Sequence, residues 1–415
     1  MKAGVSQVCI TPPVRVDLCG YVEREQPSVG VLDDLYVRGL YLETDEERLL
    51  WLNCDLICFS PKRVRLLREV CRIAHGLQPH QVILSATHTH SGPATINLRG
   101  CGRIDAEYLV QLDRWLIEAA ANAVADPEPV TLYFAESRCR MAIDRRKVSR
   151  YKYADDRLPV LAFKNDDGSY LAVLSNYPMH NVALSYENRY VSADVFGNAA
   201  EYTRASLPGK PITLLTNGGC ANVVPPQKSV DPEYMLGLAR LLGDALVQTA
   251  EQSETCLSSN LAYYSESIEL PLSVPLPDGV LREYERDCLR YDADSPWFAA
   301  ITEWKEETLQ LLDGDHPSNI MIELHLISIG PVTFTAAGAE VFTLFAEELR
   351  AAAGPNNYVI GYANGNIGYL PFWNAYKEGG YEVDTAYKFY ANFMNAPGGY
   401  EIVRDRAMVL LSAVQ

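Results

Sequence analysis

Two histidines placed two residues apart are the most distinctive chemical feature of this 415-residue sequence. His88 and His90 lie in the segment SATHTHSGP, directly after the apolar run VIL. In an extended chain, residues two apart point to the same face, so both imidazoles are expected to project together from the carboxyl end of a strand. α/β folds usually bind their ligands at that end of the strands. The spacing favours a metal site or a proton-transfer site, and a metal would need further ligands from elsewhere in the chain.

Two more candidates follow predicted strands. His180 comes after the run YLAVLSN, and Glu340 joins a long apolar strand pattern to an amphipathic helix. Taken alone, His180 also fits a hydrogen-bonded loop histidine, and Glu340 fits a first-turn helix glutamate, because a helix N-terminus favours negative charge. The other four histidines are interpreted as structural: His75, His80, His316 and His325.

The elements that must position these residues alternate between apolar, β-rich runs and amphipathic helical patterns, which is typical of an α/β fold. Strands are predicted at residues 49–58, 81–86, 130–135, 160–163, 170–176, 212–216, 261–270, 322–336 and 358–363. Helices are predicted at residues 61–74, 107–125, 193–205, 232–250 and 340–353. Residues 271–319 break this rhythm and predict an insertion or lid. The length fits one large domain with an insertion as well as two or three domains.

Charge and composition exclude several classes of function. The chain has 36 Lys and Arg against 53 Asp and Glu, which gives a net charge of −17. Because this charge repels a phosphate backbone, we do not expect the protein to bind nucleic acid. No apolar run is long enough to span a membrane, and the start, MKAGVSQVCITPP, lacks the apolar stretch of a secretory signal, so we expect a cytoplasmic protein. The ten cysteines form no C-x-x-C pair, which argues against a zinc ribbon or dithiol redox site and predicts mostly buried thiols.

Five motifs follow one another along the chain: SATHTHSGP, the run from His180 to SADVFGNA, TNGGCANVVPP, GAEVFTLFAEELR and ANGNIGYLPFWNAYKEGGYE. In that order they resemble the N-terminal catalytic domain of the neutral, non-lysosomal ceramidase family, and SATHTHSGP is the most specific of them. Ceramidases of this family hold zinc and hydrolyse the amide bond between a fatty acyl group and sphingosine. The resemblance covers most of the chain and is weakest in residues 271–319. It implies an α/β fold with mixed β-sheets flanked by helices, in which residues 1–415 form a single large catalytic domain with 271–319 as an insertion or lid.

The resemblance also implies roles for individual residues. The family's zinc ligands correspond to four residues here: His88, His180, Glu340 and Tyr369. The second histidine of the motif, which faces the reacting centre, corresponds to His90. The arginine and tyrosine that stabilise the oxyanion correspond to Arg145 and Tyr381, although Arg146 is one residue away and the surrounding IDRRKV matches only loosely.

The sequence departs from the family in ways that concern the substrate. A serine that precedes a proline in ceramidases is replaced by Val224, which removes a polar contact near the substrate. We also expect the secretory signal and the C-terminal β-domain of the ceramide-cleaving members to be absent. A small or soluble N-acylated substrate is therefore expected in place of ceramide in a membrane.

The residue types define a mechanism. Imidazole and oxygen ligands suit zinc, which can activate water for hydrolysis, and an imidazole such as His90 can move the protons. Asp194 could orient a histidine or cap the following helix, and the cap is favoured. The leading hypothesis is a zinc-dependent amidohydrolase. The alternatives are an ester or cyclic-amide hydrolase with the same site, and a non-catalytic binding protein that the metal stabilises.

Overall fold

Three five-stranded sheets form the centre of the protein. The computed structural model describes residues 1–147 and 154–414. The first sheet has the order β5-β4-β3-β1-β6, with β1 Lys2–Cys9, β3 Tyr36–Glu43, β4 Arg48–Cys54, β5 Val82–Ala86 and β6 Glu128–Pro129. The second has the order β12-β10-β9-β7-β14, with β7 Thr131–Arg138, β9 Arg157–Lys164, β10 Tyr170–Tyr177, β12 Ile212–Asn217 and β14 Glu254–Thr255. The third has the order β19-β17-β16-β15-β21, with β15 Leu261–Ser273, β16 Asn319–Ile329, β17 Val332–Ala337, β19 Asn357–Ile360 and β21 Met394–Asn395.

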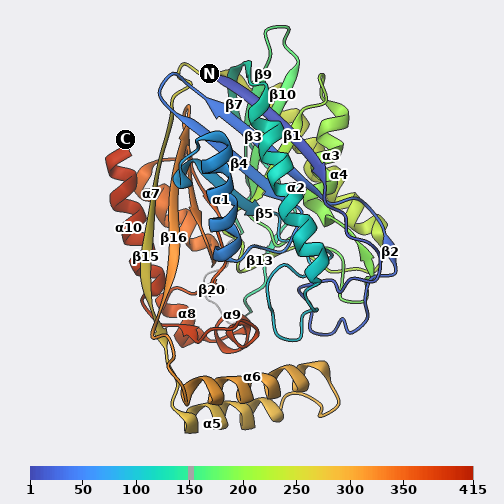
Figure 1. Cartoon of the computed structure of the whole chain (residues 1–415), viewed down its shortest axis with the longest axis vertical. Helices are drawn as coiled ribbons and strands as arrows, with labels where there is room; N and C mark the ends of the chain where they lie inside the picture. The colour runs from blue at the N-terminus through green and yellow to red at the C-terminus, as the bar shows by residue number, and fades with distance from the viewer. Residues whose placement is uncertain (148–153, 415) are drawn as a thin grey trace.

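The three sheets share one apolar core, and helices cover their other faces (Figure 1). Trp51, Phe163 and Phe334, one from each sheet, belong to this common core. A helix pair packs outside each sheet: α1 Pro61–His75 and α2 Ala106–Ala125 on the first, α3 Asp194–Ser206 and α4 Pro232–Glu251 on the second, α7 Thr343–Ala353 and α10 Gly399–Val414 on the third. The predicted α/β class with mixed sheets flanked by helices is confirmed.

Short elements complete the fold around the carboxyl ends of the strands. Three two-stranded ribbons pair β2 Gly30–Val31 with β11 Tyr190–Val191, β8 Ile143–Asp144 with β13 Val223–Val224, and β18 Glu340–Val341 with β20 Tyr369–Leu370. Two short helices, α8 Trp373–Glu378 and α9 Tyr381–Asp384, and two 3-10 turns, Pro79–Gln81 and Ala386–Phe389, lie in the connections.

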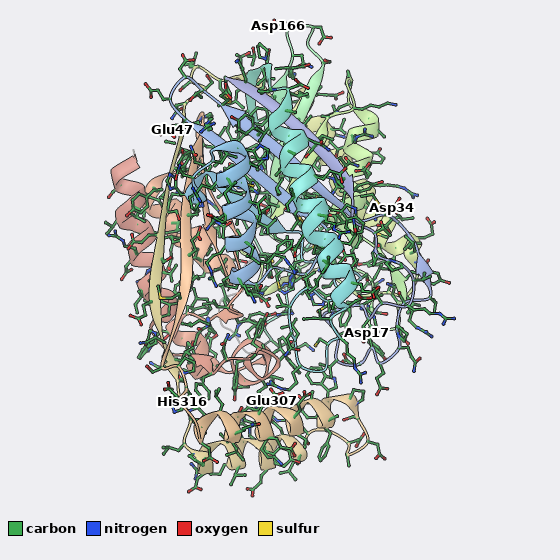
Figure 2. The ribbon with its side chains drawn as sticks, in the orientation of Figure 1. Asp17, Asp34, Glu47, Asp166, Glu307 and His316 are labelled. Atoms are coloured by element: carbon green, nitrogen blue, oxygen red, sulfur yellow. The ribbon has the colours of Figure 1, made fainter. Side chains whose placement is uncertain are left out.

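Residues 271–319 form mainly a helical hairpin that projects from the rest of the chain (Figure 1). Its helices are α5 Pro277–Cys288 and α6 Pro296–Leu312. Glu307 lies on the side of α6 that faces the other elements (Figure 2), and its carboxylate accepts a hydrogen bond from Arg99. The buried Lys388 pairs with Asp287 and Glu283 of α5, so ion pairs of Lys388 and Arg99 attach the hairpin to the body.

Several predicted boundaries were wrong. The strand predicted at 322–336 is two antiparallel strands, β16 and β17, because Gly330 turns the chain with a left-handed φ of 55°. The helix predicted from residue 340 begins at Thr343, and Glu340 belongs to the ribbon strand β18.

Strands β1 and β3 were not predicted. Gly39 in β3 has no room for a Cβ, which would lie 2.4 Å from Ser6 Oγ.

The structure also bears on the cysteines and on membrane spans. All ten cysteines are unpaired and seven of them are buried, as predicted for small core thiols. Among residues 1–147 and 154–414, no helix is both long enough and apolar enough to cross a bilayer.

Candidate metal centre

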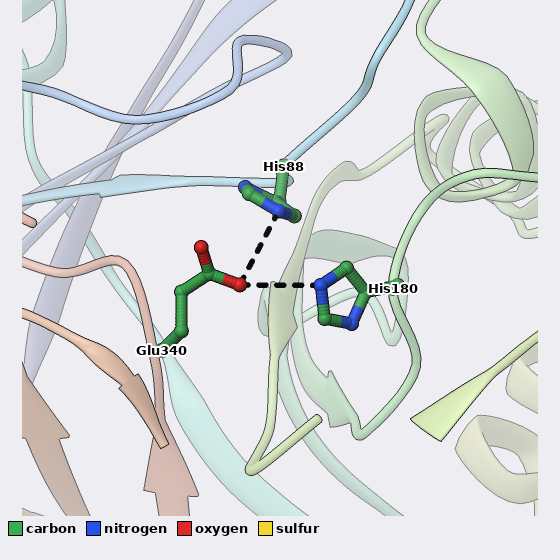
Figure 3. A group of neighbouring side chains, drawn as sticks. All are labelled: His88, His180 and Glu340. Carbon is green, nitrogen blue, oxygen red and sulfur yellow. Dashed lines mark hydrogen bonds and ion pairs between the residues drawn. The ribbon is translucent and has the colours of Figure 1, made fainter. Parts of the chain in front are cut away.

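Each of the three sheets delivers one side chain to a single buried cluster (Figure 3). His88 follows β5 of the first sheet, His180 follows β10 of the second, and Glu340 follows β17 of the third. Each of these strands pairs in parallel with a neighbour, β4, β12 and β19 respectively. Carboxyl ends of parallel strands commonly form ligand sites, and here three such ends converge.

Backbone contacts fix the orientation of both histidines. His88 Nδ1 lies 2.8 Å from the carbonyl oxygen of Ile57, and His180 Nδ1 lies 2.7 Å from that of Cys220. A carbonyl can only accept, so we assign the proton of each neutral ring to Nδ1 and the lone pair to Nε2. Both Nε2 atoms then face Glu340 Oε2, at 3.9 Å from His88 and 3.2 Å from His180.

This arrangement of acceptor atoms fits a bound cation. Burial lowers the pKa of His88 to about 4, so its imidazole is neutral at pH 7. Burial would raise the pKa of Glu340, but the adjacent His180 and His88 lower that pKa to about 2, so the carboxylate is charged. Two nitrogen lone pairs and a carboxylate therefore point at one another, with ligand atoms all within 4.8 Å. Two imidazoles and a carboxylate are a frequent protein ligand set for zinc.

Three tyrosines surround the cluster. The hydroxyl of Tyr369, the predicted fourth ligand, lies 3.3 Å from His180 Nε2. The hydroxyl of Tyr362 lies 3.2 Å from Glu340 Oε2, and its ring stacks on His88 with centroids 3.9 Å apart. Tyr390 donates to Glu340 Oε1. Tyr362 and Tyr390 were missed from the sequence. Tyr362 directly precedes the motif ANGNIGY, whereas no motif includes Tyr390.

His90 lies beside the cluster, but for a different reason from the one predicted. The chain is not extended at His88, whose φ of 60° is left-handed. That turn brings His90 Nε2 to 3.1 Å from His88 Nε2. The backbone of His90 is held by Arg24, whose Nη1 donates to its carbonyl at 2.6 Å. His90 Nδ1 is buried and has no hydrogen-bond partner among the described residues, so the contact with His88 is made by Nε2 alone.

Arg145, and not Arg146, faces the cavity beside the cluster. Its Nε donates to Glu382 at 2.9 Å, and its Nη2 donates to the Tyr369 hydroxyl at 2.9 Å. Arg146 is buried against Glu382 and Glu378. The ring of Tyr381 lies 5.3 Å from the Arg145 guanidinium, and the residue is 41% exposed.

Two secondary predictions concern neighbouring loops. Asp194 is not the N-cap of α3, which is Ala193. Its carboxylate instead accepts from the backbone N–H groups of Ala183 and Leu184, and so fixes the loop that follows His180. Val224, where the family has a serine, is buried in β13, the partner of the strand that leads into Arg145.

A cavity of about 270 Å³ opens above the cluster. Its lining includes His90, His180, Arg145, Tyr369 and Tyr381, together with Trp297 from α6. The seven sequence-predicted site residues therefore gather in one place, although the part that each plays stays a prediction.

Fold and site together define an α/β protein with a buried His-His-Glu cluster, suited to a divalent cation, at the floor of a cavity. No family model matches the chain. Similar curated sequences are neutral ceramidases: that of Pseudomonas aeruginosa is 26% identical over 220 residues, and that of Drosophila melanogaster is 24% identical over 237. These matches cover 48% and 50% of the chain, and 33% of each relative, so the matched region spans about a third of the relatives' length.

The solved structure of the P. aeruginosa neutral ceramidase has the same fold. It superimposes with a TM-score of 0.77 at 16% identity, over 100% of this chain and 74% of that one. A structure described as ceramidase complexed with C2 gives the same score over 75% of its chain. The resemblance to neutral ceramidases is confirmed.

Proposed function

We propose that this protein is a metal-dependent hydrolase that cleaves the amide bond of an N-acylated small molecule. The observation that carries the proposal is the convergence of His88, His180 and Glu340 through acceptor atoms within 4.8 Å of one another. The similar curated proteins are ceramidases by name, and ceramide is itself an N-acylated amine.

Zinc is the ion that we propose. His88 and His180 would bind it through Nε2, Glu340 through a carboxylate oxygen, and Tyr369 through its hydroxyl. When bound, the ion would act as a Lewis acid and lower the pKa of water from about 15.7 to about 7. Burial raises the pKa of Tyr369, and the positive charge of Arg145, which donates a hydrogen bond to the Tyr369 hydroxyl, opposes that rise.

His90 is proposed to move the protons. Burial holds its pKa well below the usual value, so the ring is an unprotonated base at neutral pH. The Nδ1 atoms of the two ligand histidines are held by backbone carbonyls, whereas His90 Nδ1 has no partner in the described part of the chain. Located 3.1 Å from His88, His90 would take a proton from the attacking water and pass it to the leaving nitrogen.

Arg145 and Tyr381 are proposed to stabilise the oxyanion that forms at the scissile carbonyl. Arg145 uses Nε and Nη2 for contacts within the protein; in the described part of the chain, Nη1 has no partner. Tyr381 lines the cavity and the residue is half-exposed, so its side chain can contact a ligand there. Such donors act in the transition state and commonly contribute about 3 kcal/mol each.

A chelation experiment tests the proposal. The purified protein is stripped of metal, and hydrolysis of matched N-acyl and O-acyl compounds is measured before and after zinc is restored. We expect amide hydrolysis that disappears with the metal and returns with zinc. Turnover by metal-free protein would refute the mechanism, and cleavage of O-acyl compounds alone would identify an esterase. Full zinc occupancy without turnover would identify a binding protein.

A further inference from the structure

Among the described residues, one cation that lines the cavity has no counter-ion. Lys228 lines the cavity with His90 and Arg145. Its Nζ lies 4.5 Å from the centroid of the Tyr21 ring. Within residues 1–147 and 154–414, no carboxylate comes within 4 Å of this ammonium.

The other two cations nearby are already engaged. Arg145 is paired with Glu382 at 2.9 Å. Arg24 donates to the carbonyl oxygens of His90, Tyr186 and Ser185. Of the two basic side chains that line the cavity, Lys228 is therefore the one that has neither an ion pair nor a hydrogen bond within the described residues, and its side chain reaches solvent.

The surroundings of Lys228 disfavour an isolated positive charge. The cavity wall removes part of its water and, with the positive charge of Arg145, lowers the pKa of Lys228 to about 8. The negative charges of Glu23, which also lines the cavity, and of Asp194 oppose this shift without reversing it. An anionic group bound at Lys228 would supply the missing counter-ion, and hydrogen bonds between charged partners are the strong ones.

We propose that Lys228 binds a carboxylate of the substrate, so that the preferred substrates are N-acylated compounds carrying a carboxylate. This inference rests on the proposed amide hydrolysis and adds the chemical class of the substrate. Ceramide carries no charge and two long alkyl chains, whereas the cavity measures about 270 Å³, below the range of about 300–1,000 Å³ typical of ligand pockets. The carboxylate could lie on the amine half or on the acyl half of the substrate.

Two matched pairs of compounds test both positions. N-acetyl-L-phenylalanine is compared with N-acetylphenethylamine for the amine half, and N-phenethylsuccinamic acid with N-phenethylbutanamide for the acyl half. Each is assayed with the zinc-loaded wild-type protein, with Lys228→Gln and Lys228→Arg, and with Lys62→Gln, which changes an exposed lysine outside the cavity by the same charge. Calorimetric binding of the same compounds gives a readout that does not require turnover.

We expect the wild-type protein to prefer one carboxylated compound over its neutral partner by about tenfold or more in kcat/KM. K228Q should remove that preference, chiefly through KM, and leave the neutral compound within about twofold, whereas K228R and K62Q should retain it. Hydrolysis without any preference, or an equal effect of K228Q on both members of each pair, overturns the assignment and leaves the hydrolase intact. Lys228-dependent binding of a carboxylate without hydrolysis would uphold the recognition site and reject the proposed function. If the wild-type protein binds neither carboxylated compound, the assignment is also rejected.

Discussion

The floor and the wall of the cavity satisfy their polar groups in different ways. In the floor, the Nδ1 atoms of His88 and His180 are held by backbone carbonyls, and Glu340 accepts from two tyrosine hydroxyls. In the wall, Lys228 has no counter-ion, and His90 Nδ1 has no partner in the described part of the chain.

The origin of the two regions differs as well. The floor comes from the ends of parallel strands in the three sheets, whose shared core fixes their positions. The wall comes from Gly20 near the N-terminus, Trp297 of the helical hairpin and Tyr381 of α9. The floor is thus arranged before any ligand arrives, and the wall presents groups that a substrate could satisfy. Mutations in the floor should therefore affect metal binding and the chemical step, whereas mutations in the wall should affect the choice of substrate.

The largest effect is expected in the floor. Glu340→Ala or His88→Ala should abolish zinc binding and hydrolysis together, because each removes a ligand and leaves the remaining acceptor atoms facing one another. Elemental analysis and activity are measured on the same samples, with the exposed Glu118→Ala in α2 as a control that should retain both. A variant that keeps its metal but loses activity would break the assignment of that residue as a ligand.

The next largest effect is expected where floor and wall meet. Arg145→Gln should reduce kcat by about two to three orders of magnitude, because it removes a donor to the oxyanion and the support of Tyr369. Zinc content should fall little. A loss confined to KM, at unchanged kcat, would show that Arg145 binds substrate and does not act on the transition state.

A third prediction concerns the support beneath the floor. Arg68 of α1 binds Glu323 of β16 through two bonds, at 2.6 and 2.7 Å. Glu323 also accepts from Asn364, whose side-chain oxygen accepts from the backbone of Leu84 in β5. Burial opposes this charge, but the bonds from Arg68 outweigh it and lower the pKa of Glu323 from 4.5 to about 2.

A carboxylate with a depressed pKa stabilises the fold above its unfolded pKa and loses that effect as the pH falls through the folded value. The wild-type protein should therefore exceed Glu323→Gln in unfolding free energy by about 3 kcal/mol at pH 6. The difference should shrink below about pH 4.5 and vanish near pH 2. It is measured by urea unfolding across that range, and a difference independent of pH would contradict the ion-pair account.

The smallest effect is expected from the wall. Gly20 has a φ of 108°, and a Cβ there would lie 2.4 Å from His90 Nδ1. Gly20→Ala should displace His90 and lower kcat by about tenfold without loss of zinc. Gly168→Ala is the matched control, because its φ of 84° carries similar backbone strain and nothing lies within 4 Å of its Cβ position. Equal activity losses in both variants would point to general destabilisation.

The sequence predicted much of the floor because its ligands follow recognisable strands. VIL before THTH and YLAVLSN before His180 are apolar runs that end at the ligand loops. The motif order then connected these segments to Glu340 and Tyr369, which lie far apart in the chain. The structure brings all four together.

The remainder depended on tertiary packing. Tyr362 and Tyr390 meet Glu340 only because β19 and the turn before β21 lie beside β18, which no local pattern encodes. The contact between His88 and His90 depends on the left-handed backbone conformation of His88, which is uncommon for a residue other than glycine. The two-residue repeat of an extended chain does not predict that conformation. The hairpin at Gly330 was missed because both of its strands are apolar, so the sequence pattern predicts a single continuous strand.

Anomalous diffraction at the zinc edge, on crystals grown with zinc, tests the central claim most directly. The account predicts one strong peak bonded to His88 Nε2, His180 Nε2 and a carboxylate oxygen of Glu340. Crystals with zinc in excess that show no peak between these three side chains would contradict it.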